Sequence, residues 1–230
     1  MILTDIWAWL TDPLNWQGPD GIGMQVVRHL AYSFAALAMA CVVAVPLGLW
    51  IGHTGKGSVA VVNAASALRA IPSLGLLLLG WLLLARWLPG DLAFVLPSLV
   101  VLAVLAVPPV LSGVYSGIAE VDPAARDAAK GMGMTSWQVL RQVEIPVAMP
   151  LILSGLRSGL LQIIATATIA AYVSLGGLGR FLIDGLAFRD YVMMAGGAIL
   201  VAGLALVMEL LFTLLERLVV SPGLRRKEAS

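Results

Sequence analysis

Residues 124–150 read AARDAAKGMGMTSWQVLRQVEIPVAMP and form the longest polar interruption in an otherwise apolar chain. Asp122 and Pro123 come just before this stretch and suit the N-cap and the first position of a helix. The Ala, Arg and Lys residues that follow favour helix, and Gly131 and Gly133 can end it. The sequence therefore predicts a short helix that stops at a pair of glycines.

A second short helix is predicted after the glycines. Thr135 or Ser136 can cap it. Apolar side chains then recur at near-helical spacing: Trp137, Val139, Leu140 and Val143. Pro146 is expected to end this helix, because its ring removes a hydrogen-bond donor and clashes with the preceding turn. Two short helices between membrane-length apolar segments suggest a docking loop on a membrane surface; the alternative is an ordinary amphipathic surface hairpin.

The composition predicts an all-α membrane protein. The chain is 60% hydrophobic and 12% charged, with a mean hydropathy of +0.96. A soluble domain is roughly 45–50% apolar and about 25% charged, so water could not hide this much apolar surface whereas lipid can. The net charge of +1 gives no reason to expect a nucleic-acid partner.

The sequence offers little for metal or catalytic chemistry. Cys41 is the single cysteine, which rules out a disulfide framework. His29 and His53 are far apart and have no nearby carboxylate–His pattern, so we expect no metal site, catalytic triad or cofactor. Residues 52–58, GHTGKGS, superficially resemble a phosphate-binding loop, but Lys56 is followed by glycine instead of Ser or Thr. We therefore predict no nucleotide site on this chain.

Five apolar segments are long enough to cross a bilayer. They are residues 27–51, 59–85, 92–118, 148–173 and 191–219. Pro72 is expected to kink or divide the second segment.

The segments divide the chain into three regions. Residues 1–23 are more polar, are expected to be irregular and carry several Trp residues, so we predict a segment at the membrane interface. They lack the basic start and cleavage site of a signal peptide. Residues 24–220 form the predicted transmembrane domain, with its polar loop at about 120–147. Residues 221–230 form a basic tail.

Basic residues predict the orientation, because cytoplasmic loops carry more Lys and Arg. With the polar loop inside, the cytoplasmic side holds Lys56, Arg126, Lys130, Arg141, Arg217, Arg225, Arg226 and Lys227. The opposite side holds Arg28, Arg86, Arg180 and Arg189. This asymmetry predicts an outside N-terminus and a cytoplasmic C-terminus.

The polar loop resembles the cytoplasmic loop of ABC-importer permeases, which reads E-A-A, three residues, G, nine residues, I-x-L-P. The matching residues are Asp127, Ala128, Ala129, Gly133, Val143, Ile145 and Pro146. Asp127 stands where the family has Glu, and Val143 where it has Ile. The resemblance implies that these residues form the loop that docks a cytoplasmic ATPase.

Two further stretches resemble the permeases of osmoprotectant importers. One is the IPSL sequence at residues 71–74, and the other is GLRSGLLQIIATATIAAYVSLGGLGRFLIDGL at 155–186. The resemblance implies a five-span permease bundle with a cytoplasmic coupling-helix loop. Its implied partners are ABC ATPase subunits, a second permease that is identical or homologous, and an external binding protein. Implied solutes are quaternary amines such as glycine betaine, carnitine or choline, moved by alternating access.

Several residues within the spans are candidates for the translocation path or its gate: Arg69, Pro72, Ser73, Arg157, Thr166 and Thr168. Each has a plainer interpretation. Pro72 suits a packing kink, and Thr166 and Thr168 suit hydrogen bonds to their own helix or a neighbouring one. Glycines at 176, 177 and 179 more simply make a turn.

Arg69, Arg157 and Glu209 each lie about ten residues inside a span, which corresponds to a depth of roughly 15 Å. Charges at this depth are costly and need partners. Glu209 is the acidic residue at this level, so we predict that it pairs with Arg157 or Arg69. The alternative is that the arginines snorkel or bind carbonyl groups without it.

Other functions remain open from the sequence alone. An amino-acid ABC permease, for example for methionine, would share the docking loop. A channel or ion-coupled transporter without ATP would usually need more intramembrane carboxylates or histidines than Glu209. A structural membrane subunit without a path is a third possibility.

Overall fold

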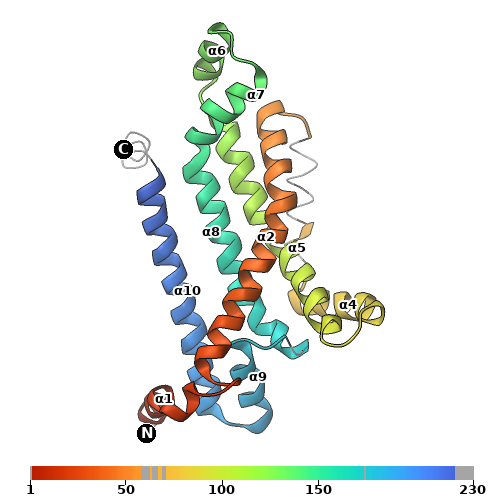
Figure 1. Cartoon of the computed structure of the whole chain (residues 1–230), viewed down its shortest axis with the longest axis vertical. Coiled ribbons are helices and arrows are strands. Elements are labelled where there is room, and N and C mark those ends of the chain that lie inside the picture. The colour runs from red at the N-terminus through yellow and green to blue at the C-terminus, as the bar shows by residue number, and fades with distance from the viewer. Residues whose placement is uncertain (1, 58–62, 64–66, 69–70, 174, 221–230) are drawn as a thin grey trace. The chain divides into compact units, whose positions relative to one another are not determined.

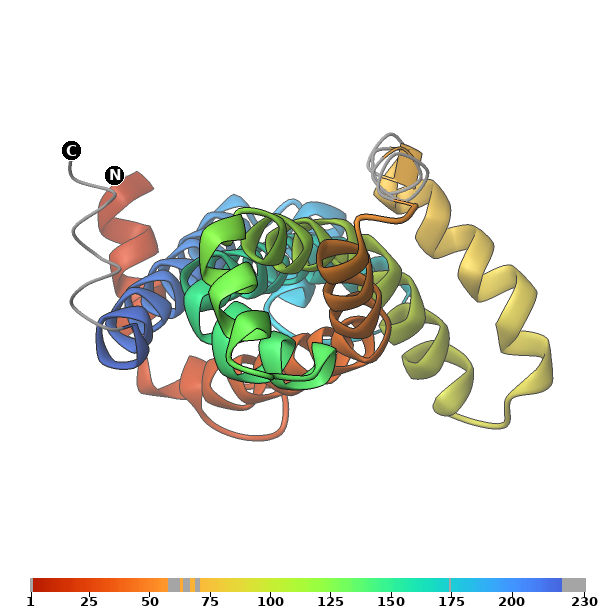
Figure 2. The same cartoon turned by 90° about the horizontal axis from the view of Figure 1, so that it is seen from above.

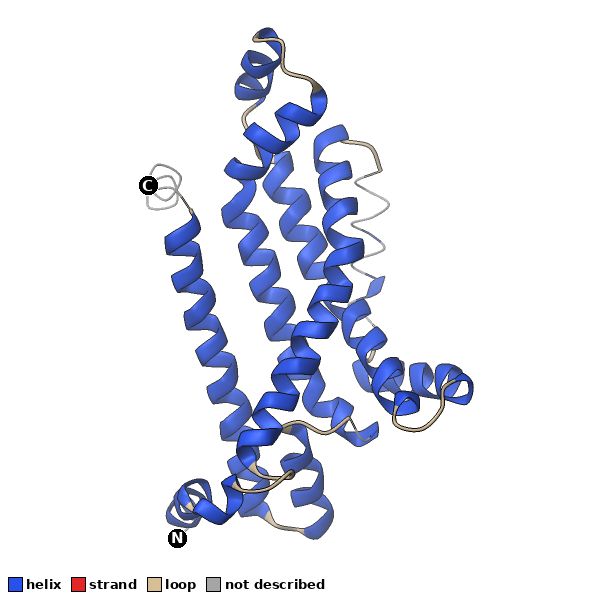
Figure 3. Ribbon diagram, in the orientation of Figure 1, coloured by secondary structure: helices blue, strands red, loops and turns tan. Residues whose placement is uncertain are grey.

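The computed structural model describes residues 2–57, 63, 67–68, 71–173 and 175–220. Over these residues the chain is built from helices and turns and contains no strand (Figure 3). The helices are α1 (Ile2–Thr11), α2 (Ile22–Thr54), α4 (Ser73–Leu84), α5 (Leu92–Ala119), α6 (Pro123–Gly131), α7 (Ser136–Val139), α8 (Ile145–Ala170), α9 (Gly179–Phe188) and α10 (Tyr191–Val219) (Figure 1).

Four helical stretches among the described residues are long and apolar enough to cross a membrane. They are Ile22–Thr54, Leu92–Ala119, Ser136–Val173 and Tyr191–Val219. They match four of the five predicted spans. The other, residues 59–85, falls partly outside the described residues. Its described end is α4, which begins only after Pro72, so the helix is interrupted where the proline predicted a kink or a division.

The chain forms two compact units. The first unit comprises Met1–Met39, Ile71–Ala106 and Leu160–Met208. The second unit comprises Ala40–Ala70, Val107–Gly159 and Glu209–Ser230. The polar loop therefore belongs wholly to the second unit.

Glycines allow close helix contacts in the second unit. A Cβ on Gly113 of α5 would lie 2.6 Å from the Cα of Gly155 in α8, so any side chain here would push the two helices apart. Gly52 of α2 packs equally tightly, since its Cβ would lie 2.6 Å from the Cβ of Ile118. Small residues of this kind let helix backbones approach closely within a membrane.

Helices α6 and α7 lie beyond the ends of α5 and α8, beside the last turn of α2 (Figures 1 and 2). Under them, the buried side chains of Ile118, Leu140 and Ala148 form a cluster. Contacts within this cluster pack the polar loop against the spans that flank it.

In the first unit, the N-terminal segment is helical where the sequence suggested irregular structure. Trp9 of α1 packs edge-on against Phe181 of α9, with ring centroids 5.4 Å apart. The same indole covers Gly196 of α10, where a Cβ would lie 2.4 Å from the ring. This apolar contact holds α1 in place, which the count of polar residues in 1–23 could not reveal. Residues 179–188 form the short helix α9 in the connection before the last span.

Pro146 does not end a helix, contrary to the sequence prediction. Residues Ser136–Val173 form one continuous helical stretch in which Leu140–Glu144 is a π-helical turn. The amide of Ile145 donates to the carbonyl of Leu140, five residues back. A π-helical turn is wider than an α-helical one, so it accommodates the proline ring and the missing donor without breaking the helix.

Candidate functional site

The first part of the polar loop is a capped helix, as the sequence predicts. Asp122 Oδ1 accepts a hydrogen bond from the amide of Ala124 at 2.9 Å, and Pro123 occupies the first helical turn. Helix α6 ends at Gly131. Gly133 then adopts a φ of +85°, a left-handed conformation that glycine reaches without strain.

Thr135, one of the two predicted candidates, caps the second short helix. Its amide donates to Gln138 Oε1 at 2.7 Å, and its Oγ1 accepts from the amide of Gln138 at 3.4 Å. This reciprocal pair is a capping box, and it fixes the start of α7 at Ser136.

The residues of the predicted docking motif divide by exposure. Asp127, Ala128, Gly133 and Pro146 are exposed, Val143 and Ile145 are half-buried, and Ala129 is buried. Two further apolar side chains on this loop are also exposed, Met132 at 73% and Trp137 at 65%. The loop therefore has an inner face that packs on the spans and an outer face with apolar side chains free for contact.

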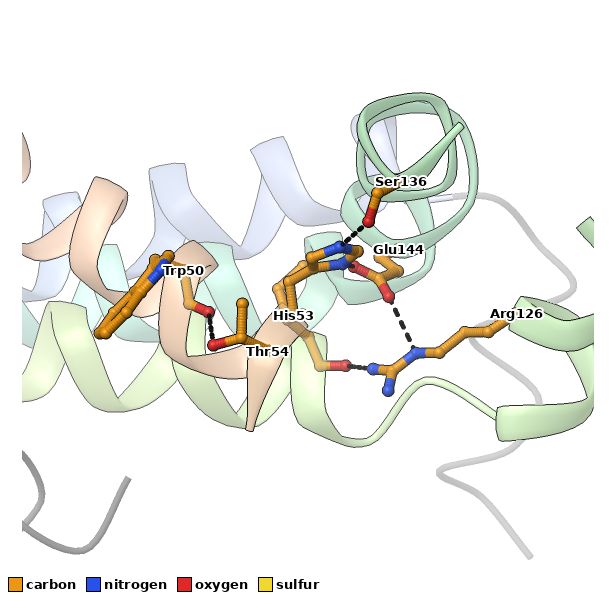
Figure 4. A network of polar contacts seen from close by, with 7 residues as sticks. Trp50, His53, Thr54, Arg126, Ser136 and Glu144 are labelled. Atoms are coloured by element: carbon orange, nitrogen blue, oxygen red, sulfur yellow. Dashed lines mark hydrogen bonds and ion pairs between the residues drawn. The ribbon is translucent and has the colours of Figure 1, made fainter. Parts of the chain in front are cut away.

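A buried carboxylate lies at the root of this loop (Figure 4). Glu144 is 1% exposed, and its Oε2 lies 2.6 Å from Nδ1 of His53, in the last turn of α2. Its Oε1 makes an ion pair with Nε of Arg126 in α6 at 2.9 Å. Arg126 also donates through Nη2 to the carbonyl of Ile118, at the end of α5.

His53 extends this network to the second docking helix. Its Nε2 lies 2.7 Å from Oγ of Ser136, the first residue of α7 (Figure 4). One tautomer of a neutral imidazole satisfies both contacts: Nδ1–H donates to Glu144, and Nε2 accepts from the Ser136 hydroxyl. Because a buried charge needs compensation, the Arg126 guanidinium balances the Glu144 carboxylate.

The Ser136–His53–Glu144 order has the hydrogen-bond connectivity of an acyl-transfer triad. The other oxygen of the Glu144 carboxylate, however, makes the ion pair with Arg126. This cation reduces the ability of Glu144 to stabilise an imidazolium, so the arrangement suits a structural tie better than a nucleophile. Sequence reasoning missed it, because His53 and Glu144 lie 91 residues apart.

The second unit also contains an intramembrane ion pair. Nη1 of Arg157 in α8 lies 3.1 Å from Oε1 of Glu209 in α10. This is one of the two pairings that the sequence suggests. The side chains are 29% and 38% exposed in the isolated chain. Arg69, the other candidate partner of Glu209, lies outside the described residues.

The other candidate path residues bond locally. Thr166 Oγ1 donates to the carbonyl of Gln162 at 2.8 Å, and Thr168 Oγ1 donates to that of Ala165 at 2.6 Å. These are the hydrogen bonds to the preceding turn that the plainer interpretation predicted. Pro72 and Ser73 form the start of α4.

In the first unit, two polar residues of α2 hold the glycine turn after α8. Gln25 Oε1 accepts from the amide of Gly177 at 2.8 Å, and His29 Nδ1 accepts from the amide of Leu178 at 3.2 Å. His29 Nε2 then carries the proton and donates to the carbonyl of Ile164 at 3.1 Å. Both side chains are buried, and this contact was not predictable from sequence, because its partners lie about 150 residues apart.

Also within the first unit, Arg180 joins α9 to the segment before α2. Its guanidinium contacts Asp184 at 3.0 Å and Asp20 at 2.6 Å. The hydrogen bond that Arg180 donates to Asp184, together with the charge of Asp20, raises the pKa of Arg180 above its usual value. The Arg180–Asp20 ion pair therefore links α9 to the segment between α1 and α2.

The chain matches a known family of membrane proteins. A family model described as the inner membrane component of binding-protein-dependent transport systems matches residues 44–221. The chain belongs to this family. The permease is therefore a multi-pass inner-membrane subunit of an ABC importer and is not itself an enzyme. In general terms, the family implies an ATPase partner, a second permease and a binding protein.

Curated relatives narrow the group further. The permease is 34% identical over 204 residues to the glycine betaine/carnitine/choline transport system permease protein OpuCB of Bacillus subtilis, covering 88% of this chain and 91% of the relative. It is 33% identical over 198 residues to the osmoprotectant import permease protein OsmW of Salmonella typhimurium, covering 86% and 91%.

Solved structures share the fold at lower identity. The inward-facing MetNI methionine ABC transporter matches with a TM-score of 0.76 and 21% identity, over 92% of this chain and 100% of that chain. An amino acid ABC transporter with histidines matches with a TM-score of 0.66 and 23% identity, over 85% and 92%. These matches establish the permease fold and carry no argument about the solute.

Proposed function

We propose that the permease imports compatible solutes of the quaternary-amine class, such as glycine betaine, carnitine or choline. The observation that carries this proposal is its similarity to osmoprotectant permeases. The relatives described as importing these solutes or osmoprotectants are 32–35% identical over more than four-fifths of the chain. The methionine alternative rests only on fold similarity, at 21% identity.

The solute is tested by reconstituting the permease in liposomes with its ATPase and binding protein. We expect ATP-dependent uptake of radiolabelled glycine betaine, carnitine or choline that excess unlabelled quaternary amine abolishes. Methionine serves as the matched competitor and is expected to have no effect. Uptake blocked by methionine alone would overturn the proposed solute class.

We also propose that the ATPase docks on the loop of residues 120–147. The exposed Met132 and Trp137 support this, since apolar side chains on a polar loop suit contact with a partner protein. The residues that we assign to this docking loop are those that match the family motif: Asp127, Ala128, Ala129, Gly133, Val143, Ile145 and Pro146. Docking requires a cytoplasmic loop, and the distribution of basic residues supports that orientation.

Transport would follow alternating access. Closure of two ATPase subunits moves two docking loops, one on each permease, and the spans tilt with them. The second permease is identical or homologous. Arg69, Pro72, Ser73, Arg157, Thr166 and Thr168 stay candidates for the path. Because the hydroxyls of Thr166 and Thr168 already donate to carbonyl groups of their own helix, donating instead to a solute carboxylate would require those bonds to open.

A further inference from the structure

One carboxylate connects every helix that meets at the root of the polar loop. Glu144 contacts His53 of α2 and Arg126 of α6 directly. Through His53 it reaches Ser136 of α7, and through Arg126 it reaches the carbonyl of Ile118 in α5. Glu144 itself lies in the π-helical turn that leads into α8.

These contacts are stronger ties than ordinary surface hydrogen bonds. The His53–Glu144 contact is a hydrogen bond to an ionised group, 2.6 Å long, and such bonds are roughly twice as strong as neutral ones. The contact of Glu144 with Arg126 is an ion pair at 2.9 Å. Glu144 is buried, so water cannot replace a lost partner easily. The Ser136 contact is neutral and exposed, so it is the weaker end of the network.

The network links two parts with different roles. Helices α6 and α7 make up the loop that we propose as the docking site. The last turn of α2 belongs to a span that is not adjacent to this loop in the sequence, since His53 lies 91 residues before Glu144. Among the described residues, the His53 imidazole makes the polar side-chain contacts that join α2 to the loop.

We propose that His53 and Glu144 couple the docking loop to the first span, so that the end of α2 moves with the loop during the ATPase cycle. His53 acts here as a positioning residue that touches neither solute nor ATP. This inference rests on the proposed docking function of the loop. It assigns a transport role to two residues that are not among the matched motif residues: Glu144 occupies the variable position between Val143 and Ile145, and His53 lies in another helix.

Variants separate the two contacts of His53. In His53→Asn, the amide nitrogen can take the place of Nδ1 and keep the bond to Glu144. His53→Ala loses both contacts, and Ser136→Ala loses only the weaker one. Glu144→Gln keeps the side-chain size but removes the charge that holds Arg126. Ser136→Ala therefore shows what the loss of the weaker contact does by itself.

The direct test measures one distance in the assembled complex. Spin labels replace the exposed Lys56, after α2, and Lys130, at the end of α6, in a Cys41→Ala background. In the unmodified network we expect the same narrow distance without nucleotide and after trapping with ATP and vanadate. In His53→Ala we expect a broad distance that changes with nucleotide, and His53→Asn should restore the narrow one.

Two results would overturn the inference. Either the Lys56–Lys130 distance already changes with nucleotide in the unmodified complex, or His53→Ala leaves it narrow and constant. A coupling ratio gives a second readout that a merely structural role would not move. In His53→Ala, solute imported per ATP hydrolysed should fall by roughly ten- to hundredfold, the effect of losing one hydrogen bond to an ionised group, with complex assembly unchanged.

The spin-label distance does not depend on the identity of the solute. If the complex imports no quaternary amine but the distance behaves as expected, the proposed solute class fails and the coupling stands. If the ATPase does not bind the loop, nucleotide trapping fails in every variant, and the docking proposal on which this inference rests is wrong.

Discussion

Gly133 has a backbone conformation that other residues resist, with φ at +85°, while nothing lies within 4 Å of where its Cβ would be. Replacing it with Ala therefore costs backbone strain alone, about 1–2 kcal/mol. We expect Gly133→Ala to reduce ATPase association and solute-stimulated ATP hydrolysis, and Gly133→Val to reduce them further. Both proteins should still insert into the membrane.

Gly131 provides the matched control. It has the same open surroundings but no positive φ, so Gly131→Ala should leave association close to that of the unmodified protein. Pull-down of the ATPase on the detergent-solubilised permease measures both variants. Equal loss from the two substitutions would show that the left-handed turn is not the reason for the effect.

Glu209 has one ion-pair partner among the described residues, Arg157 at 3.1 Å. Glu209→Gln leaves that guanidinium without a counter-charge inside the membrane, where a charge is costly. We expect a loss of stability of about 1–3 kcal/mol, seen as a lower Tm of the solubilised permease. Glu209→Gln combined with Arg157→Gln should recover part of this loss. A double variant no more stable than Glu209→Gln alone would contradict the pairing.

Residue-level prediction succeeded where the signal is local. Gly133, Asp122 and Thr135 were predictable because caps and turns depend on residues a few positions away. The depth of Glu209 along its span was enough to suggest Arg157 or Arg69 as its partner, but not to choose between them. His53 and Glu144 were not predictable, since their contact spans 91 residues and neither neighbourhood shows a pairing pattern.

At the scale of elements, α7 depends on its capping box. Thr135→Val is close in shape but cannot accept the amide of Gln138, whereas Thr135→Ser can. We expect Thr135→Val to cost about 1 kcal/mol locally and to speed hydrogen exchange at residues 136–139. Thr135→Ser should exchange like the unmodified chain. Unchanged exchange in Thr135→Val would mean that the π-helical turn and its burial hold α7 without the cap.

Hydropathy predicted the long helices well, because lipid requires continuous apolar segments of about 20 residues. It could not predict what proline does inside them. Pro146 was expected to stop a helix, and the π-helical turn before it keeps the helix continuous. The same limitation applies to α1, whose helix depends on the contact of Trp9 with Phe181 and Gly196.

At the scale of the whole molecule, the docking proposal requires that the polar loop face the cytoplasm. The distribution of Lys and Arg supports this orientation, which predicts a C-terminal tail inside and α9 outside. Both consequences can be measured without any knowledge of the solute. They also do not depend on the number of spans before α5.

Cysteine labelling in intact cells tests this orientation, in a background where Cys41 is replaced by Ala. A cysteine at Ala187, an exposed position in α9, should react with a membrane-impermeant thiol reagent. A cysteine at Ala229 in the tail should react only after the membrane is opened with detergent. Labelling of the tail alone in intact cells would place the loop outside, where a cytoplasmic ATPase cannot reach it. That result would overturn the orientation and the docking proposal together.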